Sequence, residues 1–481
     1  MDGLKLLLPE FGLSLMALGL MVCDLFFDRR AGKALLALGF VAAGVALGSL
    51  GLAYNAPEAY SGLGTLWAVD PMSLFFKAVI LATTTFVLML SIDYKPAAEL
   101  RHPGSFTALV LFSAVGMMLL VSATDLLLIF LSLELVSICS FILVGFERRD
   151  LKSSEGAIKY FLFGSFSSAI FIYGISFLYG ALGSTSLLDL RPLLGEGPAL
   201  MFMVGCILLL VGFGFKVSMV PFHFWVPDAY EGAPIPVTTF LSIAPKAAAL
   251  GVMVRVFNHL IPHSQLELTG LFSLLAVLTM TVGNLTALFQ TNIKRLLAYS
   301  SIAQAGYMLI GFVTADAMGR EGLILYTFVY VFMNLGAFAV ALTLGNEEGY
   351  ELEAFDGLSQ RNLGLALLMT FFMLSLAGIP PLAGFIAKFT LFAAAVKTGH
   401  VWLAVAAVLN SVISVYYYMS VVYHMFFKQA RTHEPAPTRL FVTGTLAVAA
   451  VGVLFIGLYP EPFLAVAHLS AEFLPSAAAL P

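Results

Sequence analysis

The sequence predicts an all-α, polytopic membrane protein with about 14 transmembrane helices. Hydrophobic residues make up 60% of the 481 residues, and charged residues only 11%. A soluble domain is roughly half apolar and a quarter charged, so this composition, with a mean hydropathy of +0.96, excludes a large soluble domain. The spacing of long apolar stretches supports the same fold class, because each bilayer crossing needs about 20 mainly apolar residues.

Stretches of this length follow one another along nearly the whole chain. They lie near residues 4–26, 32–53, 72–92, 106–123, 126–146, 156–181, 199–226, 236–257, 270–290, 294–313, 322–345, 364–395, 401–427 and 438–459. The first stretch has no basic segment before it and no small-residue cleavage site after it, so we interpret it as a retained helix rather than a signal peptide.

Basic residues are distributed unevenly between the predicted loops. Odd-numbered loops and their edges carry Arg29, Arg30, Lys33, Lys95, Arg101, Arg148, Arg149, Lys152, Lys294, Arg295, Arg361, Lys428, Arg431 and Arg439, whereas even-numbered loops carry little beyond Arg191, Arg320 and Lys397. Lys and Arg are enriched in cytoplasmic loops, so this asymmetry predicts both termini on the non-cytoplasmic side. The net charge of −4 gives no indication of nucleic-acid binding.

An internal repeat relates two parts of the chain. Gly145-Phe146, Glu155-Gly156 and Tyr160 recur with one constant displacement as Gly311-Phe312, Glu321-Gly322 and Tyr326. We therefore expect three N-terminal helices in residues 1–103, a five-helix unit in 104–258, a second unit in 259–427, and a C-terminal helix and tail in 428–481. Each unit has an odd number of spans, so the second is expected to be inverted in the membrane, as in many transporters.

Prolines interrupt one apolar span in each unit, at Pro221 and at Pro380-Pro381. Proline has no N–H, so the carbonyl four residues earlier loses its helical partner. The carbonyls concerned are those of Val217, Leu376 and Ala377. Non-helical backbone at membrane depth is tolerated where it is buried in protein or lines a hydrated cavity, so both breaks are predicted to lie on such an axis.

Four ionisable residues, Glu134, Lys216, Lys246 and Lys388, lie inside the predicted spans. An ammonium group at the centre of a bilayer costs roughly 2.5–3.5 kcal/mol, so such residues normally face a bundle interior or an aqueous cavity and mark ion pathways. The alternative is snorkelling, in which a lysine near a helix end reaches the headgroups. Snorkelling fits Lys77, Lys159 and Arg255, which are nearer the ends of their spans, and a purely structural ion pair is the alternative for Glu134.

The Glu134 and Lys216 side chains form a candidate switch. Burial disfavours an ammonium ion and a nearby carboxylate favours it, so a change in their separation would switch the lysine between binding and releasing a proton. His223, two residues after Pro221, is either a proton relay or a hydrogen-bond partner of the broken backbone.

Polar side chains recur at helical spacing in three later spans. The stripes are Ser300, Gln304 and Tyr307; Tyr326, Tyr330 and Asn334; and Asn410, Ser414 and Tyr417. They either order a file of water or form hydrogen bonds between packed helices, each worth roughly 0.6 kcal/mol. Cys23, Cys139 and Cys206 lie singly in apolar spans, so the sequence predicts no cluster, haem, nucleotide or metal site.

Three motifs resemble subunit N of proton-translocating NADH:quinone oxidoreductase, the respiratory complex I family. They are KVSMVPFHFWVPDAYEGAPIPV at 216–237, RLLAYSSIAQAGY at 295–307 and GIPPLAGFIAKF at 378–389. Together with the span pattern, the resemblance extends over nearly the whole chain. It implies an antiporter-like subunit that translocates protons, with Glu134 and Lys216 as the charge pair, Lys246 as the connecting lysine and Lys388 as the exit-side lysine.

The resemblance also implies what the chain lacks. NADH, FMN, iron–sulfur clusters and quinone are expected on other subunits, so this chain would be a non-redox subunit of the enzyme without a complete active site. Its partners would be the lipid bilayer and other membrane-arm subunits, including homologous antiporter-like and small membrane subunits, in the bacterial plasma membrane. Many relatives have histidine at the position of Gln304, and glutamine cannot titrate.

Two other functions are compatible with the same sequence. In a multisubunit cation/proton antiporter, the buried axis would exchange sodium for protons, but the related antiporter subunit typically has glutamate at the position of Lys388. An inert membrane scaffold is the second alternative, and it would tolerate loss of the buried charges.

Overall fold

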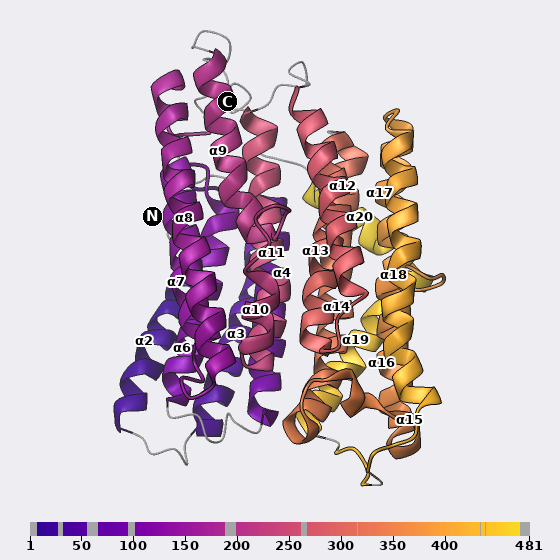
Figure 1. The fold of residues 1–481 in the computed structure, drawn as a ribbon. Helices are drawn as coiled ribbons and strands as arrows, with labels where there is room; N and C mark the ends of the chain where they lie inside the picture. The colour runs from indigo at the N-terminus through magenta and orange to yellow at the C-terminus, as the bar shows by residue number, and fades with distance from the viewer. Residues whose placement is uncertain are drawn as a thin grey trace.

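The computed structural model describes residues 7–26, 32–54, 66–94, 102–187, 199–260, 267–314, 316–432, 434–437 and 439–471. They form a bundle of α-helices (Figure 1). In chain order these are α2 (Leu8–Phe26), α3 (Gly32–Tyr54), α4 (Pro71–Asp93), α6 (Pro103–Ser122), α7 (Leu126–Val144), α8 (Leu151–Leu182), α9 (Ala199–Val217), α10 (Val226–Gly232), α11 (Ile235–Leu260), α12 (Glu267–Ala287), α13 (Ile293–Thr314), α14 (Ala317–Glu348), the 3-10 helix η3 (Leu352–Phe355), α15 (Leu358–Arg361), α16 (Leu363–Ala377), α17 (Ala383–Lys397), α18 (Val401–Phe427), α19 (Leu440–Leu458) and α20 (Glu461–Ser470). The loop residues Arg29, Arg30, Lys95, Arg101 and Arg191 lie outside the described ranges.

The predicted all-α membrane fold is confirmed. In the described part of the chain, 13 helices are long and apolar enough to cross a bilayer. The remaining predicted span, near 364–395, is divided into α16 and α17, which have 15 residues each. Extended backbone segments pair within the described ranges through isolated bridges, such as Trp67 with Ala123.

Short polar side chains determine where several helices begin. Asp70 accepts a hydrogen bond of 2.7 Å from the Ser73 amide, and the Ser73 hydroxyl accepts one from the Asp70 amide, which completes a capping box at the start of α4. Asp125, Asp150 and Asn362 cap α7, α8 and α16. These caps provide acceptors for N–H groups that have no partner within the helix.

The centre of the bundle is α11. All of its membrane-spanning window is buried, whereas only 22% of the window of α2 is buried at the periphery. α11 packs against α4, α6, α9 and α14. Because Lys246 belongs to α11, this lysine lies in the middle of the protein rather than at its surface.

Both predicted helix breaks are present. The first separates α9 from α10, and the second separates α16 from α17. In Figure 1, α10 follows α9 toward the lower half of the molecule, whereas α17 follows α16 toward the upper half. Cis peptide bonds precede Pro221 and Pro381. By contrast, α11 continues without interruption through Pro245.

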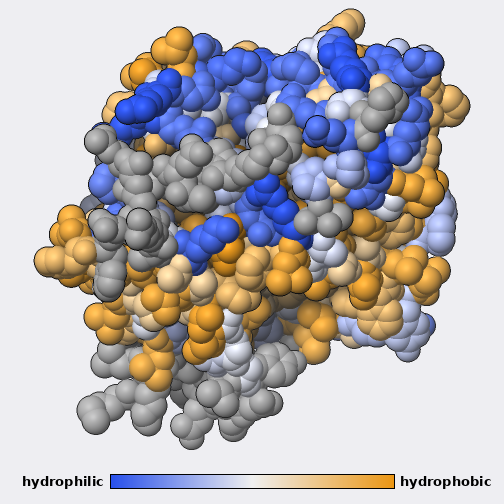
Figure 2. All heavy atoms as spheres, turned by 90° about the horizontal axis from the view of Figure 1, so that it is seen from below, coloured by the Kyte–Doolittle hydropathy of each residue, from blue (hydrophilic) through white to orange (hydrophobic). Residues whose placement is uncertain are grey.

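The end of the molecule seen from below differs from its sides. Hydrophilic side chains gather over a broad area of this end, and apolar side chains border that area (Figure 2). Apolar side chains such as Phe166, Tyr416 and Leu409 are exposed on outer helices. This distribution suits a protein with apolar sides that contact lipid and a polar end that contacts water.

Candidate functional site

Glu134 and Lys216 line one pocket between α7, α8 and α9. Glu134 is half-buried, and its carboxylate accepts a hydrogen bond from the Ser168 hydroxyl. Lys216 is buried in the last turn of α9, and its Nζ has no hydrogen-bond partner within the described ranges. The structure therefore brings the predicted pair to one pocket, without recording a direct ion pair between them.

Aromatic rings surround the Lys216 ammonium group instead of acceptors. Its Nζ lies 5.8 Å from the ring centroid of Phe141, 5.7 Å from that of Tyr160 and 5.5 Å from that of Phe215. Ring faces attract a cation through their quadrupole. The positive charge is thus stabilised by an attraction that leaves the N–H donors unused.

Lys246 is held by the main chain and side chain of a neighbouring helix. Its Nζ donates to the hydroxyl of Ser301 on α13 at 2.7 Å and to the Ser301 carbonyl at 3.0 Å. The preceding Pro245 deprives the Leu241 carbonyl of its helical donor. The hydroxyl of Tyr230 on α10 donates to that carbonyl at 3.2 Å, and the Tyr230 ring lies 5.9 Å from Nζ. The Tyr230 hydroxyl thus replaces the hydrogen bond that Pro245 removes from α11.

The second break satisfies its two free carbonyls with side chains. Lys388 Nζ donates to the Ala377 carbonyl at 2.9 Å and lies 4.6 Å from the centroid of the Tyr307 ring. Gln304 Nε2 donates to the Leu376 carbonyl at 3.1 Å. These are the two carbonyls at this break that the proline positions predict to be without a helical partner. Lys388 therefore binds its own helix break.

Gln304 is the centre of a buried polar cluster. Its amide nitrogen also donates to the Tyr418 hydroxyl at 3.0 Å, and its amide oxygen accepts from the Tyr326 hydroxyl. The Ser300 and Tyr418 hydroxyls lie 2.6 Å apart. Tyr418 was missed by sequence reasoning because it adjoins Tyr417 of the predicted stripe but lies outside its spacing.

Asn284 joins the predicted polar stripes of α13 and α18. Its Nδ2 donates to the Tyr307 hydroxyl at 3.2 Å and to the Asn410 carbonyl at 3.1 Å, and its Oδ1 accepts from the Tyr417 hydroxyl at 3.0 Å. Sequence reasoning did not single out this residue. A lone amide in the apolar α12 was the available signal, because buried amides in membrane helices bind across to their neighbours.

His223 lies between α9 and α10 and is buried. Its ring is 4.5 Å from that of Phe224, and its Nδ1 has no hydrogen-bond partner in the part of the chain that the structure describes. Within that part, no hydrogen bond joins it to Lys216, Lys246 or Lys388. Its relay role stays a prediction.

The snorkelling interpretation is wrong for Lys77 and Arg255. Lys77 is buried and pairs with Glu10 at 2.7 Å, which joins α4 to α2. Arg255 on α11 binds the carboxylate of Asp70 through two nitrogens, at 2.7 and 2.9 Å. Position within a span could not reveal these partners, which come from distant helices. The first pair joins two of the N-terminal helices to each other, and the second attaches the start of α4 to the central α11.

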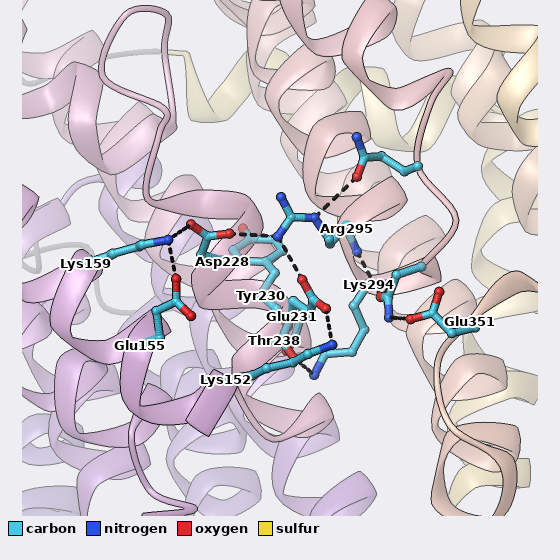
Figure 3. A network of polar contacts seen from close by, with 12 residues as sticks. Lys152, Glu155, Lys159, Asp228, Tyr230, Glu231, Thr238, Lys294, Arg295 and Glu351 are labelled. Atoms are coloured by element: carbon cyan, nitrogen blue, oxygen red, sulfur yellow. Dashed lines mark hydrogen bonds and ion pairs between the residues drawn. The ribbon is translucent and has the colours of Figure 1, made fainter. Parts of the chain in front are cut away.

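An ionic cluster surrounds α10 (Figure 3). The Asp228 carboxylate contacts Lys159 at 2.6 Å and Arg295 at 2.7 Å. The Glu231 carboxylate contacts Lys152 at 2.7 Å and Arg295 at 2.8 Å. Burial raises the pKa of both carboxyl groups, but their hydrogen bonds to these cations outweigh burial and hold each pKa below its usual value. Sequence reasoning did not predict this cluster.

Within the described ranges, no group of three or more His, Cys, Asp or Glu side chains lies close enough together to hold a metal ion. Cys23, Cys139 and Cys206 are free thiols.

Comparison with known proteins identifies the family. Residues 123–414 match the transmembrane family described as NADH:quinone oxidoreductase/Mrp antiporter. NADH-quinone oxidoreductase subunit N of Trichlorobacter lovleyi is 41% identical, over 98% of each chain. The chain belongs to the subunit N family of NADH-quinone oxidoreductase.

Two further comparisons agree with this family assignment. The F(420)H(2) dehydrogenase subunit N of Methanosarcina mazei is 42% identical, over 85% of each chain. In the solved structure of respiratory complex I from Thermus thermophilus with bound aureothin, one chain is 33% identical, with a TM-score of 0.81 and coverage of 96% of this chain and 99% of that one.

Proposed function

We propose that this subunit N family member translocates protons as a membrane-arm subunit of a NADH:quinone oxidoreductase. The observation that carries the proposal is the burial of Lys216, Lys246 and Lys388. Within the described ranges, none of their ammonium groups forms an ion pair with a carboxylate; two bind neutral oxygens and one faces aromatic rings. Lysines kept at such a cost at membrane depth are typical of ion pathways.

The proposed route begins at Glu134 and Lys216, continues to Lys246 and leaves through Lys388. The shared pocket supports the first step, because a modest movement there would bring the carboxylate to the ammonium group. α13 supports the later steps, since it carries both Ser301, which binds Lys246, and the amide that binds the second break. The hydroxyl and amide groups between them are donors and acceptors suited to ordering water.

His223 is proposed as an additional relay beside the first break. Its buried Nδ1 has no hydrogen-bond partner in the described part of the chain, so the nitrogen is available to accept or donate a proton. The alternative role of the imidazole ring is to form a hydrogen bond with the interrupted backbone near Pro221.

We also infer that residues 104–258 and 259–427 are inverted repeats, preceded by three helices in 1–103 and followed by a helix and tail in 428–481. The opposite directions of α10 and α17 in Figure 1 support the inversion. Each repeat would contribute one broken helix with a lysine beside it. Transporters with inverted repeats bind their ions at such breaks near the membrane midplane.

The remaining parts of the enzyme would lie outside this chain. NADH, FMN, iron–sulfur clusters and quinone would be bound by other subunits, and redox chemistry there would drive proton transfer here. The partners would be homologous antiporter-like subunits and small membrane subunits. The chain would lie in the bacterial plasma membrane. The distribution of Lys and Arg between the loops supports an orientation with both termini on the non-cytoplasmic side.

A second candidate is a subunit of a multisubunit cation/proton antiporter, since the matching family model includes Mrp antiporters. Lys388 weighs against it, because a fixed ammonium group at the second break repels sodium. Sodium-dependent proton movement in the purified complex would favour the antiporter.

The test uses the assembled complex in proteoliposomes, carrying Lys216→Ala or Glu134→Ala. We expect normal assembly with reduced proton pumping and reduced coupled quinone reduction. Lys397→Ala is the matched control, because Lys397 is exposed at the end of α17. Normal pumping by both pocket variants would identify the chain as a scaffold and reject the proposal.

A further inference from the structure

α10 is a seven-residue helix held from both sides of the molecule. Its two carboxylates bind Lys152 and Lys159 of α8 on one side and Arg295 of α13 on the other (Figure 3). Its C-terminal end is bound as well, because Lys294 Nζ donates to the Glu231 carbonyl at 2.5 Å and to the Ala233 carbonyl at 2.6 Å. Cations at a helix C-terminus also interact favourably with the helix dipole.

The same short helix contacts the central lysine. Tyr230 lies between the two acidic residues in sequence, and its hydroxyl donates to the Leu241 carbonyl that Pro245 leaves free. The Thr238 hydroxyl donates to the Tyr230 carbonyl at 2.8 Å, which fixes this part of α10 against the start of α11. Tyr230 is fully buried, and its ring lies beside the Lys246 ammonium group.

We propose that Arg295 and Tyr230 are positioning residues for proton transfer at Lys246, linked to each other by α10. The inference rests on the proposed function, in which Lys246 carries protons. Arg295 would hold α10 through Asp228 and Glu231, and the position of α10 would set the position of the Tyr230 hydroxyl.

The consequence for Lys246 follows from hydrogen-bond satisfaction. If α10 shifts, the Leu241 carbonyl loses its donor in apolar surroundings, where an unsatisfied carbonyl is costly. Lys246 is a charged donor on the same helix, next to Tyr230, so its ammonium group would compete for that carbonyl and leave Ser301. Tyr230 therefore keeps Lys246 directed toward α13 and the second break.

Coupling through such a chain of contacts is tested by a double-mutant cycle. The variants are Tyr230→Phe, Arg295→Gln and the two combined, each in the assembled complex reconstituted into proteoliposomes. Protons pumped per quinone reduced are measured together with the rate of quinone reduction. We expect each single variant to lower pumping about fivefold, the size expected for one lost hydrogen bond, and the double variant to be no worse than either. Multiplied effects in the double variant, or normal pumping in Tyr230→Phe, would overturn the inference.

Matched controls separate positioning from general damage. Arg361→Gln removes another ion pair, with Glu348 at 2.5 Å, and Tyr423→Phe removes the hydroxyl of an exposed side chain. Both should pump normally. Arg295→Lys should recover pumping only in part, because Nη1 of Arg295 contacts both carboxylates while its Nε donates to Gln290 at 3.3 Å, and one ammonium group cannot make both sets of contacts. If Arg295→Gln does not assemble, Glu231→Gln replaces it in the cycle with the same expected result.

Lys246→Ala distinguishes failure of this inference from failure of the proposed function. Normal pumping by Lys246→Ala would reject the proposed route itself. Reduced pumping by Lys246→Ala with normal pumping by Tyr230→Phe would reject only the role of α10.

Discussion

The two helix breaks look alike in sequence but differ in how their lysines are bound. At the first break, Lys216 lies among three aromatic rings, and its Nζ has no hydrogen-bond partner within the described ranges. At the second break, Lys388 donates to the Ala377 carbonyl and Gln304 donates to the Leu376 carbonyl. Among the described residues, only the second of these lysines forms a hydrogen bond, and that bond contributes to the structure of its own break.

This difference bears on which break can change state easily. Moving Lys216 toward Glu134 breaks no hydrogen bond of the ammonium group, whereas moving Lys388 leaves a buried carbonyl unsatisfied, at a cost of about 1–3 kcal/mol. A proton switch is therefore easier to build at the first break. The second break is better suited to hold a fixed arrangement until a proton arrives.

The largest effect on stability is expected from Gln304→Leu. The substitution removes the partners of the Leu376 carbonyl and of the Tyr326 hydroxyl, whereas Tyr418 keeps Ser300 as a partner; leaving the first two groups unpaired costs about 3 kcal/mol in total. Thermal unfolding of the assembled complex measures the loss. Gln304→His, which retains a donor and an acceptor, should lose less. Equal stability of Gln304→Leu and the unmodified protein would mean that the second break needs no side-chain donor.

Lysine removal tests the comparison itself. Lys388→Met should destabilise the complex by about 1.5–3 kcal/mol, because a hydrogen bond from a charged group is lost, whereas Lys216→Met should cost much less. The measurement is the thermal midpoint of the two variants side by side. Both variants should lower pumping. Only Lys216→Met should do so without a large loss of stability. A larger destabilisation by Lys216→Met would reverse the assignment of the two breaks.

The aromatic surroundings of Lys216 make a smaller contribution. Phe141→Leu should remove about 0.5–1 kcal/mol of attraction for the ammonium group. The same substitution in a Lys216→Met background separates the attraction between the Phe141 ring and the ammonium group from the change in packing. An identical loss of stability in both backgrounds would show that the rings serve packing alone.

The smallest effect concerns pH and the α10 cluster, which lies at the end of the first broken helix. The folded-state pKa values of Asp228 and Glu231 are lowered, so their stabilisation is complete above the ordinary carboxyl pKa of about 4. It is lost only as pH falls through the lowered values. Hydrogen-exchange protection of the α10 amides should therefore be constant between about pH 6 and 8. Loss of protection in that range would contradict the lowered pKa values.

Local chemistry predicted much of the candidate site. Proline positions indicated both breaks and identified the Leu376 and Ala377 carbonyls as lacking helical partners. The same reasoning did not predict which side chains bind these carbonyls. Gln304, for example, reaches the Leu376 carbonyl from another helix. Lys77 and Arg255 were misinterpreted for the same reason, since their carboxylate partners are distant in the chain.

The sequence by itself determined the membrane class, the spans, the breaks and the burial of Lys216, Lys246 and Lys388, because hydropathy, chain length and the missing proline N–H act locally. Tertiary structure alone decided which polar group binds which. Pro245 interrupts no helix because Tyr230 reaches the carbonyl it frees, and α10 is fixed by cations from two other helices. Hydrogen bonds and ion pairs depend on distances of a few ångströms between helices, and those distances exist only once the bundle has packed.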